Sequence, residues 1–364
     1  MKALAAGGAL KGTMTPARAT AALARGIARA WPGARVLEHP VADGGPGTLQ
    51  VAARAVGASF VEATVRDAHG AERRAAWLRM PDGSVLIESA SACGAGSQPA
   101  RPLRASSEGV ADLLLSALER TAGPVRIGLG GSLSTDGGSG FLRALGAECL
   151  DGHGAPAGRG GGALADLRTV RLGGLCGPVR SAVGAGCLTA LADVGNALLG
   201  PRGAARTYAA QKGAGPEEVD LLEQGLTVWA GLLEAASGRA ARERPGAGAA
   251  GGLGFGLACG LGAALESGAA WILDAGGFDD LLGGCDLVLT CEGRFDGDAH
   301  PWKAPAAVLA RAQAAGIPAA VLCAEASTAA GGNRVFAAGG PIDEEGLARL
   351  AEQAARTLLA GRVR

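Results

Sequence analysis

The sequence predicts an α/β protein with two α/β domains, one a Rossmann-like parallel sheet built from both chain ends and the other an inserted mixed α/β domain. Three observations lead to this prediction. Apolar segments of strand length alternate with segments of helical spacing near both ends of the chain. Residues 60–90 interrupt that alternation with three strand-like runs in succession. Several apolar runs also end in loops rich in glycine and carboxylates, where open α/β sheets bind their ligands.

The amino-terminal segment is predicted to begin with a short buried strand, followed by a helix. Thr15 is a suitable N-cap, and Pro16 stands at the first helical position. Leu23, Ile27 and Trp31 follow at helical spacing. We expect strands at 3–6 and 36–41, and helices from residue 16 onward and over 49–56.

Residues 60–90 are expected to form three antiparallel strands. Asp82-Gly83, between the second and the third, is a strong hairpin signal. The strand–helix alternation then resumes, and residues 151–182, rich in glycine and short polar runs, are expected to loop over the surface. The expected strands of this middle part are 60–65, 74–80, 85–88, 125–129 and 188–194, and the expected helices are 113–118, one beginning near 141, and 216–237.

The carboxyl-terminal segment returns to the α/β alternation. Strands are expected at 285–290 and 317–323, and helices at 304–314 and 343–359. Because the two ends of the chain share this pattern, we expect residues 1–58 and 275–364 to form the parallel-sheet domain and residues 59–274 to form the inserted domain.

Composition excludes several classes of function. The 364 residues carry 34 basic and 34 acidic side chains, so neither nucleic acid nor an anionic membrane is an expected partner. The longest apolar stretch, 253–265, is too short to span a bilayer. None of the eight cysteines belongs to a C-x-x-C pair, and the four histidines lack zinc-ligand spacing. We therefore predict free thiols and a cytoplasmic protein.

Lysine is scarce in this chain. Only Lys2, Lys11, Lys212 and Lys303 stand among the 34 basic residues. A lysine in an arginine-rich chain indicates a position that needs a compact ammonium rather than a planar guanidinium. We interpret Lys2 as chance, whereas the other three lie in loops punctuated by glycine or proline and are candidate functional residues.

Loops at predicted strand ends combine glycine with acidic side chains. Glycines let main-chain N–H groups approach an anion, carboxylates suit Mg²⁺, and basic side chains neutralise a phosphoryl group in transfer. Each loop alone is more commonly a turn or an N-cap, and none has the G-x-G-x-x-G or P-loop pattern. Their concentration at strand ends predicts phosphoryl transfer. The loops hold Asp43-Gly44-Gly45, residues 130–138 around Asp136, Asp193, and Glu292 with Arg294 and Asp296.

Seven motifs follow one another along the chain. They are Lys11-Gly12; residues 41–45 with Gly47-Thr48; residues 128–132 with Asp136-Gly137-Gly138; Asp193 with Asn196 and residues 198–201; residues 211–214; residues 246–252; and Glu292-Gly293-Arg294 with Asp296 and Lys303-Ala304-Pro305. In this order and spacing the chain resembles the type I glycerate kinases over nearly its whole length.

This resemblance implies transfer of the γ-phosphoryl group of ATP to a hydroxyl of D-glycerate, giving a phosphoglycerate, with Mg²⁺ as cofactor. It also implies a site in a cleft between two α/β domains. The implied catalytic residues are Lys11, Asp193, Arg294 and Lys303; the implied substrate- or nucleotide-binding residues are Asp43, Gly44, Gly45, Gly130, Gly131, Ser132, Asn196 and Lys212; and the implied metal ligands are Asp136, Glu292 and Asp296. The sequence does not separate the base from the metal ligands among these carboxylates, and Lys212 could equally cap a helix.

Several positions depart from the pattern of that family. Several of these departures remove side-chain oxygens that the family carries, which could weaken binding by about 1–3 kcal/mol per lost contact, and Trp302 stands where the family has a glycine. A second hypothesis is therefore a diverged relative with weak or no kinase activity that binds a nucleotide or metabolite. A third, a nicotinamide-dependent oxidoreductase, has the wrong loop spacing. A homodimer is left open. The departures are Gly8, Ala9, Pro46, Thr135, Gly195, Asp298, Ala299 and Trp302.

Overall fold

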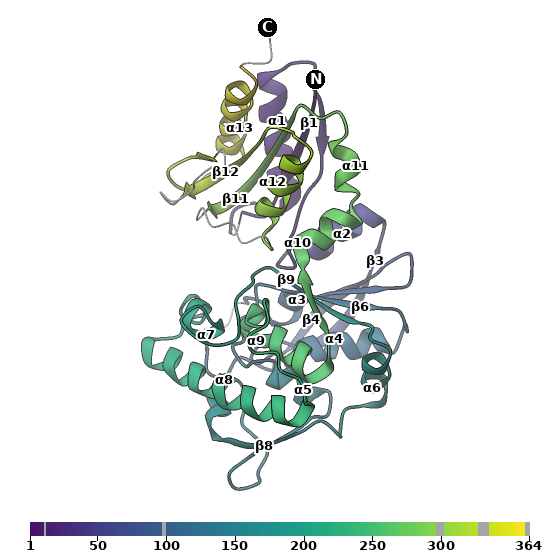
Figure 1. The fold of residues 1–364 in the computed structure, drawn as a ribbon, viewed down its shortest axis with the longest axis vertical. Coiled ribbons are helices and arrows are strands. Elements are labelled where there is room, and N and C mark those ends of the chain that lie inside the picture. Colours follow the sequence, from purple (N-terminus) through teal and green to yellow (C-terminus); the bar gives the residue numbers. More distant parts are fainter. Residues whose placement is uncertain (11, 97–99, 296–301, 327–334, 361–364) are drawn as a thin grey trace. The chain divides into compact units, whose positions relative to one another are not determined.

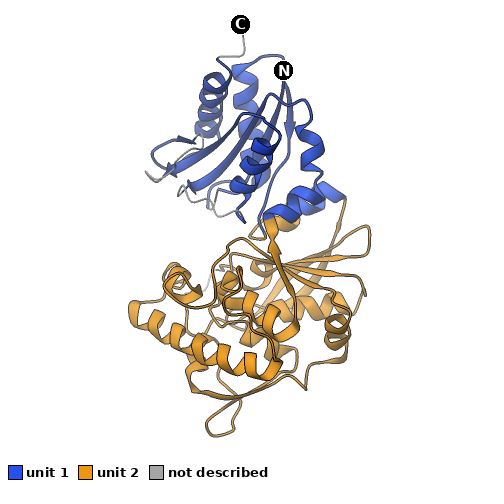
Figure 2. Ribbon diagram, in the orientation of Figure 1, with its two compact units in different colours: residues 1–43, 50–56, 269–364 blue, residues 44–49, 57–268 orange. Residues whose placement is uncertain are grey.

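A computed structural model describes residues 1–10, 12–96, 100–295, 302–326 and 335–360. Two predicted site residues, Lys11 and Asp296, lie outside the described residues. The chain divides into two compact units (Figure 2). Unit 1 comprises Met1–Asp43, Gln50–Val56 and Ala269–Arg364, and unit 2 comprises Gly44–Leu49 and Gly57–Gly268. Independent domains with limits at 58 and 274 stay a prediction.

Unit 1 contains a five-stranded parallel sheet in the order β13-β12-β11-β1-β2 (Figure 1). The first two strands come from the amino-terminal segment and the other three from the carboxyl-terminal segment, so the predicted sheet from both chain ends is confirmed. The strands are β1 (Lys2–Gly7), β2 (Arg35–Glu38), β11 (Leu287–Phe295), β12 (Ala319–Ala326) and β13 (Val335–Ala337).

Helices cover both faces of this sheet. Side chains that alternate along β1 pack against the helices on one face or the other. Ala3 and Ala5 pack in one apolar cluster with α1 (Pro16–Ala30) and α13 (Glu344–Leu359). Leu4 and Ala6 point to the other face. That face is covered by α10 (Gly268–Ala275), α11 (Phe278–Leu282) and α12 (Ala304–Ala314). Burial on both faces explains why the strands read as continuous apolar runs.

Local signals in unit 1 act as predicted, with one exception. The Thr15 hydroxyl accepts a hydrogen bond from the main-chain N–H of Arg18 at 3.4 Å and caps α1, and Pro16 is its first residue. The strand predicted at 36–41 is wrong at its end, because β2 stops at Glu38. Pro40, two residues later, has no N–H to donate to a ladder.

Unit 2 contains a six-stranded mixed sheet in the order β10-β9-β6-β5-β4-β3. Strands β3, β4 and β5 pair antiparallel, which confirms the predicted meander, and the remaining pairs of this sheet are parallel. The Asp82 carboxylate accepts from the N–H and hydroxyl of Ser84 and closes the hairpin. The strands are β3 (Ser59–Arg66), β4 (Glu72–Arg79), β5 (Val85–Glu88), β6 (Val125–Leu129), β9 (Leu188–Ala192) and β10 (Ala264–Ser267).

Helices and short turns surround this sheet. The expectation that residues 151–182 only loop over the surface is wrong, because they include a 3-10 turn, a strand and a helix held by buried apolar side chains such as Leu167 and Val179. The remaining elements are α3 (Ser89–Cys93), α4 (Glu108–Leu118), α5 (Ser139–Ala144), β7 (Glu148–Asp151), η1 (Gly161–Asp166), β8 (Leu167–Arg171), α6 (Gly177–Gly184), α7 (Ala204–Tyr208), η2 (Ala210–Lys212), α8 (Pro216–Ser237), α9 (Ala249–Phe255) and the π-turn η3 (Gly256–Gly260), and α2 (Thr48–Val56) crosses the limit between the units.

No helix within the described ranges combines the length and the apolar character that a membrane span requires.

The close contact between α1 and α13 leaves no room for a side chain at Gly26. A Cβ atom at this position would lie 2.2 Å from the carbonyl oxygen of Ala348 in α13. Gly26→Ala should therefore lower the free energy of unfolding by about 1–3 kcal/mol, as measured by urea denaturation.

The matched control is Gly231→Ala in α8, where an added Cβ has nothing within 4 Å. Alanine has the higher helix propensity, so this variant should gain up to about 1 kcal/mol. Equal effects of the two substitutions would contradict the close packing of the helices.

Candidate active site

The strand order of unit 1 places a topological switch point between β1 and β11. In doubly wound sheets ligands bind outside the carboxyl ends of the strands at such a point. Gly7, the last residue of β1, pairs with Cys291 of β11, and Glu292 follows Cys291. Glu292 therefore lies at the edge of the sheet where a ligand of this unit is expected.

Lys303 joins Glu292 at this edge. It precedes α12 as its N-cap residue, and its Nζ lies 3.1 Å from Oε1 of Glu292. Both side chains keep contact with solvent, with 36% and 21% of their surface exposed, so the pair adds little to stability. Two predicted site residues, 11 positions apart in the chain, are thus brought together.

Two further predicted residues of unit 1 are described. Arg294 lies near the end of β11 and is exposed, and Asp43 is half-buried. Asp43 ends the amino-terminal segment of unit 1 and precedes the Gly44–Leu49 segment of unit 2.

In unit 2 the predicted glycines pack main chain against main chain. A Cβ on Gly44 would lie 2.5 Å from the carbonyl oxygen of Leu191, and one on Gly128 would lie 2.6 Å from the carbonyl oxygen of Gly44. A Cβ on Gly130 would lie 2.6 Å from Cα of Gly45. Glycines in such loops are predicted to let main-chain N–H groups approach an anion, whereas in the structure these glycines bring the 44–49 segment onto the ends of β6 and β9.

Neighbouring residues complete this contact. Gly131 has a left-handed φ of +67° and faces the ring of Pro46, so a Cβ there would lie 2.6 Å from the proline. The hydroxyl of Ser132, a predicted binding residue, lies 2.7 Å from the hydroxyl of Ser134, and both serines are buried. The hydroxyl of Ser132 therefore forms a hydrogen bond within its own loop.

Glu88, which sequence reasoning missed, anchors the 44–49 segment. It ends β5, is only 7% exposed, and its Oε2 accepts hydrogen bonds from the N–H groups of Gly47 and Leu49, each at 3.2 Å. The signal in the sequence was an acidic residue closing an apolar strand. Such a residue is rarely buried without partners.

Asp193 lies where β6 and β9 end. It is half-buried, and a Cβ on Gly130 would lie 3.0 Å from its Oδ2. Burial raises the pKa of Tyr208 to about 12, and the negative charge of Asp193 adds to that rise. Asp193 is therefore a carboxylate at the sheet edge with a phenol nearby.

Tyr208, the single tyrosine of the chain, was not predicted. Its hydroxyl donates to Oδ1 of Asn196 at 2.8 Å, and Nδ2 of Asn196 donates to the carbonyl oxygen of Arg202 at 2.6 Å. Both polar atoms of Asn196 thus bind protein groups. This pattern supports a role in holding the 193–202 loop rather than the predicted contact with substrate.

Asp136 is fully buried and saturated with protein donors. Its carboxylate accepts from the N–H and hydroxyl of Ser107 at 2.8 and 2.9 Å, and from the N–H groups of Gly138 and Gly140 at 3.2 Å each. Burial raises the pKa of Asp136, while these hydrogen bonds oppose that rise. The arrangement is that of a structural carboxylate and does not support the predicted role as a metal ligand.

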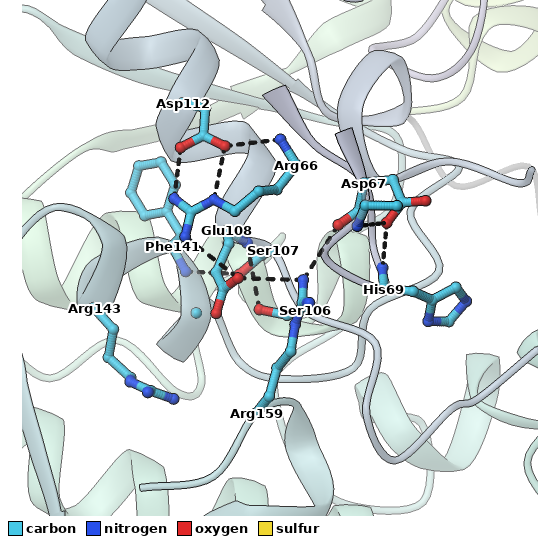
Figure 3. A network of polar contacts seen from close by, with 12 residues as sticks. Arg66, Asp67, His69, Ser106, Ser107, Glu108, Asp112, Phe141, Arg143 and Arg159 are labelled. Carbon is cyan, nitrogen blue, oxygen red and sulfur yellow. Dashed lines mark hydrogen bonds and ion pairs between the residues drawn. The ribbon is translucent and has the colours of Figure 1, made fainter. Parts of the chain in front are cut away.

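A network of ion pairs lies next to Ser107 in the chain (Figure 3). Next to Ser107, Glu108 lies between Arg66 and Arg159, at 3.5 and 3.2 Å. Arg66 also binds Asp112 through two nitrogens. The Ser107 hydroxyl, which donates to Asp136, accepts from the N–H of Phe141, so it connects the starts of α4 and α5.

Lys212 is also buried, with 8% of the residue exposed. Its Nζ donates to the carbonyl oxygen of Ser134 at 2.6 Å and lies 3.5 Å from Oγ1 of Thr135. Burial lowers the pKa of Lys212 to about 8, and the negative charges of Asp136 and Asp193 oppose the decrease. The ammonium therefore lies among the loops that follow β6 and β9.

These features define a class of protein. The chain is an α/β protein with two units, and each unit carries charged groups and glycines at the carboxyl ends of parallel strands. Comparison with known proteins gives the family. The profile of the Glycerate kinase family matches residues 3–342, and the chain belongs to this family. It is therefore a kinase with an alcohol group as acceptor.

Individual relatives agree with this assignment. A glycerate kinase of Bacillus subtilis is 36% identical over 322 residues, which cover 87% of this chain and 83% of the relative. A glycerate 2-kinase of Escherichia coli is 35% identical, covering 85% and 81%. The crystal structure of a putative glycerate kinase 2 from Salmonella typhimurium superposes with a TM-score of 0.77 at 30% identity, covering 100% of this chain and 99% of that one.

Because Glu88 is buried and binds the 44–49 segment, Glu88→Ala should strongly lower the stability of the fold. Two buried N–H groups would lose their acceptor, so the free energy of unfolding should fall by about 2–4 kcal/mol in urea titration. Glu345→Ala is the control, because Glu345 is exposed and pairs with Arg29 at the surface. That change should cost at most about 1 kcal/mol, and a similar cost for both variants would argue against the anchor.

The lowered pKa of Lys212 predicts that the stability of the fold depends on pH. The pKa of its ammonium is lowered from 10.5 to about 8 in the folded chain, so between these values the unfolded chain binds more protons. The free energy of unfolding should rise with pH in that window by up to about 1.4 kcal/mol per pH unit. Urea unfolding of the protein and of Lys212→Met across the window tests this. The same pH dependence in both would contradict it.

Proposed function

We propose that this protein is a glycerate kinase, which transfers the γ-phosphoryl group of ATP to a hydroxyl of D-glycerate and releases a phosphoglycerate and ADP. The observation that carries the proposal is the Lys303–Glu292 pair at the switch point of a doubly wound sheet, in a chain of the Glycerate kinase family. The relatives named glycerate kinase support the choice of acceptor.

Lys303 and Arg294 are assigned to the charge of the phosphate groups, together with Lys11. In phosphoryl transfer the catalytic contribution is mainly positioning and electrostatic stabilisation, because charge spreads over the transferring oxygens. Lys303 at the N-terminus of α12 adds its ammonium to the positive end of the helix dipole. The exposed fraction of its side chain leaves it accessible to a phosphate.

Asp193 is assigned as the base. The hydroxyl oxygen of glycerate attacks the γ-phosphorus, the bond to the bridging oxygen of ADP breaks, and the hydroxyl proton passes to Asp193. A carboxylate suits this role when it lies within hydrogen-bond reach of the hydroxyl and is ionised before the reaction. Asp193 fits because it is half-buried at the end of β9, unlike the fully buried Asp136.

Mg²⁺ would be held by few protein ligands. Among the described residues, no three His, Cys, Asp or Glu side chains lie close enough together to hold a metal ion. Proteins commonly bind Mg²⁺ through one or two carboxylates and the phosphates of the nucleotide, so the donors present fit a magnesium ion that arrives with ATP. Glu292, with Asp296, is the assigned protein contribution. When bound, the ion would neutralise charge on the phosphate oxygens.

The setting of the enzyme is part of the proposal. All eight cysteines are free thiols, which supports a reducing compartment such as the cytoplasm. The small-molecule substrate and ATP are the proposed partners, and the two units are proposed to be the predicted domains. Size-exclusion chromatography with light scattering will show whether a homodimer forms.

The first test is ATP consumption by the purified protein with D-glycerate and Mg²⁺. We expect turnover of at least about 1 s⁻¹, as in working enzymes, and a phosphoglycerate whose substituted carbon is read by ³¹P–¹H NMR. Lys303→Met and Lys11→Ala should each abolish turnover, and Lys303→Arg should lower it at least about tenfold, with melting temperatures nearly unchanged.

Arg311→Met is the matched control for Lys303. Arg311 lies in the last turn of the same helix and pairs with Asp274 and Asp279, away from the strand ends that carry Glu292. It should keep full turnover. A folded protein that binds ATP–Mg²⁺ without turnover would overturn the proposal in favour of a diverged nucleotide-binding protein.

A further inference from the structure

Lys212 is enclosed by other segments of unit 2. It ends the turn η2, and the following Gly213 reverses the chain with a left-handed φ of +94°. The residue is 8% exposed, and its Nζ is directed to the main chain of the loop that follows β6. An ammonium in this position is satisfied by protein oxygens before any substrate arrives.

The loop that Lys212 contacts is confined on its other sides as well. A Cβ on Gly251 would lie 2.0 Å from the carbonyl oxygen of Ser134, and one on Gly161 would lie 2.1 Å from the carbonyl oxygen of Thr135. The N–H of Gly137 donates to the carbonyl oxygen of Gly251 at 3.0 Å. Residues 134–137 are thus held between glycine main chain and the ammonium of Lys212.

We propose that Lys212 is a positioning residue, which fixes the glycine-rich loop 130–138 relative to Asp193 and does not itself contact the nucleotide or glycerate. This inference rests on the proposed function for its effect on catalysis. Four charged or polar groups face the ammonium: the carbonyl of Ser134, the hydroxyl of Thr135, and the charges of Asp136 and Asp193. They belong to the two loops at the ends of β6 and β9.

The size of the group explains why a lysine stands here. An ammonium presents three donors at one point, whereas a guanidinium needs a wider planar space and five acceptors. The carbonyl oxygens of Ser134 and Thr135 are themselves packed closely against Gly251 and Gly161. Lys2 of unit 1 serves as a comparison within the chain, because its ammonium likewise donates to main-chain carbonyl oxygens, in its case those of Leu281 and Gly283.

The test compares Lys212→Met with the matched control Lys2→Met. Three quantities are measured in each: kcat with D-glycerate, the Kd for ADP–Mg²⁺, and amide hydrogen exchange of residues 134–138. For Lys212→Met we expect kcat to fall at least about tenfold, the Kd to stay within about threefold, and exchange of these amides to accelerate at least about tenfold. Lys2→Met should leave all three within about twofold.

Opposite outcomes would overturn the inference. A tenfold weaker Kd with unchanged exchange would assign Lys212 to the nucleotide, and an unchanged kcat in the folded variant would remove its role. If Lys212→Met does not fold, Lys212→Arg keeps the charge without the compact shape and should show the same loss of kcat and faster exchange. Wild-type behaviour of Lys212→Arg would contradict the need for an ammonium.

The experiment distinguishes failure of the proposed function from failure of the positioning role of Lys212. If the unmodified protein does not phosphorylate glycerate, the activity is wrong, yet hydrogen exchange still reports on the loop. Faster exchange of residues 134–138 in Lys212→Met would then support its positioning role, and unchanged exchange would overturn it.

Discussion

Main chain packed directly against main chain is the contact on which the candidate site of unit 2 depends. Gly44, Gly128 and Gly130 allow the 44–49 segment to lie on the ends of two parallel strands, and Gly251 does the same for the loop after β6. This packing carries loop N–H and carbonyl groups into the interior, where each one needs a partner. The buried charges supply those partners. Glu88 and Asp136 accept from loop N–H groups, and Lys212 donates to a loop carbonyl.

Unit 1 also carries charged groups at the carboxyl ends of its strands, but they are placed there by the strand order of its sheet. Its parallel sheet is buried on both faces, and small residues such as Ala3 and Ala5 let α1 and α13 approach it closely. The strand order then creates a switch point, and the chain places Glu292 there with Lys303 beside it. The Glu292–Lys303 pair of unit 1 keeps contact with solvent, whereas Glu88, Asp136 and Lys212 of unit 2 support loops and are buried.

Some of the departures from the family pattern can be related to contacts in the structure, whereas Asp298 and Ala299 lie outside the described residues. A Cβ on Gly8 would lie 3.3 Å from the carbonyl oxygen of Cys291, so a side chain at this position needs a small shift of the adjoining strand. Pro46 packs on Gly131, which is left-handed and has no Cβ to collide with the ring. Next to Gly195, the hydroxyl of Tyr208 donates to Asn196 and holds the loop. Thr135 contributes a hydroxyl near Lys212. Nothing in the structure explains Trp302.

The sequence by itself determined the elements that depend on local signals. Thr15-Pro16 starts α1, Asp82-Gly83 closes a hairpin, and the helices at Pro216–Ser237 and Ala304–Ala314 have the predicted limits, because capping, turn formation and periodicity act between residues a few positions apart. Tertiary structure alone decided the roles of the charged residues. Asp136 meets Ser107 29 positions away, and Lys212 meets Ser134 78 positions away. A carboxylate or ammonium in a glycine-rich loop looks the same in sequence whether it faces a ligand or the main chain, since the difference lies in which distant segment covers it.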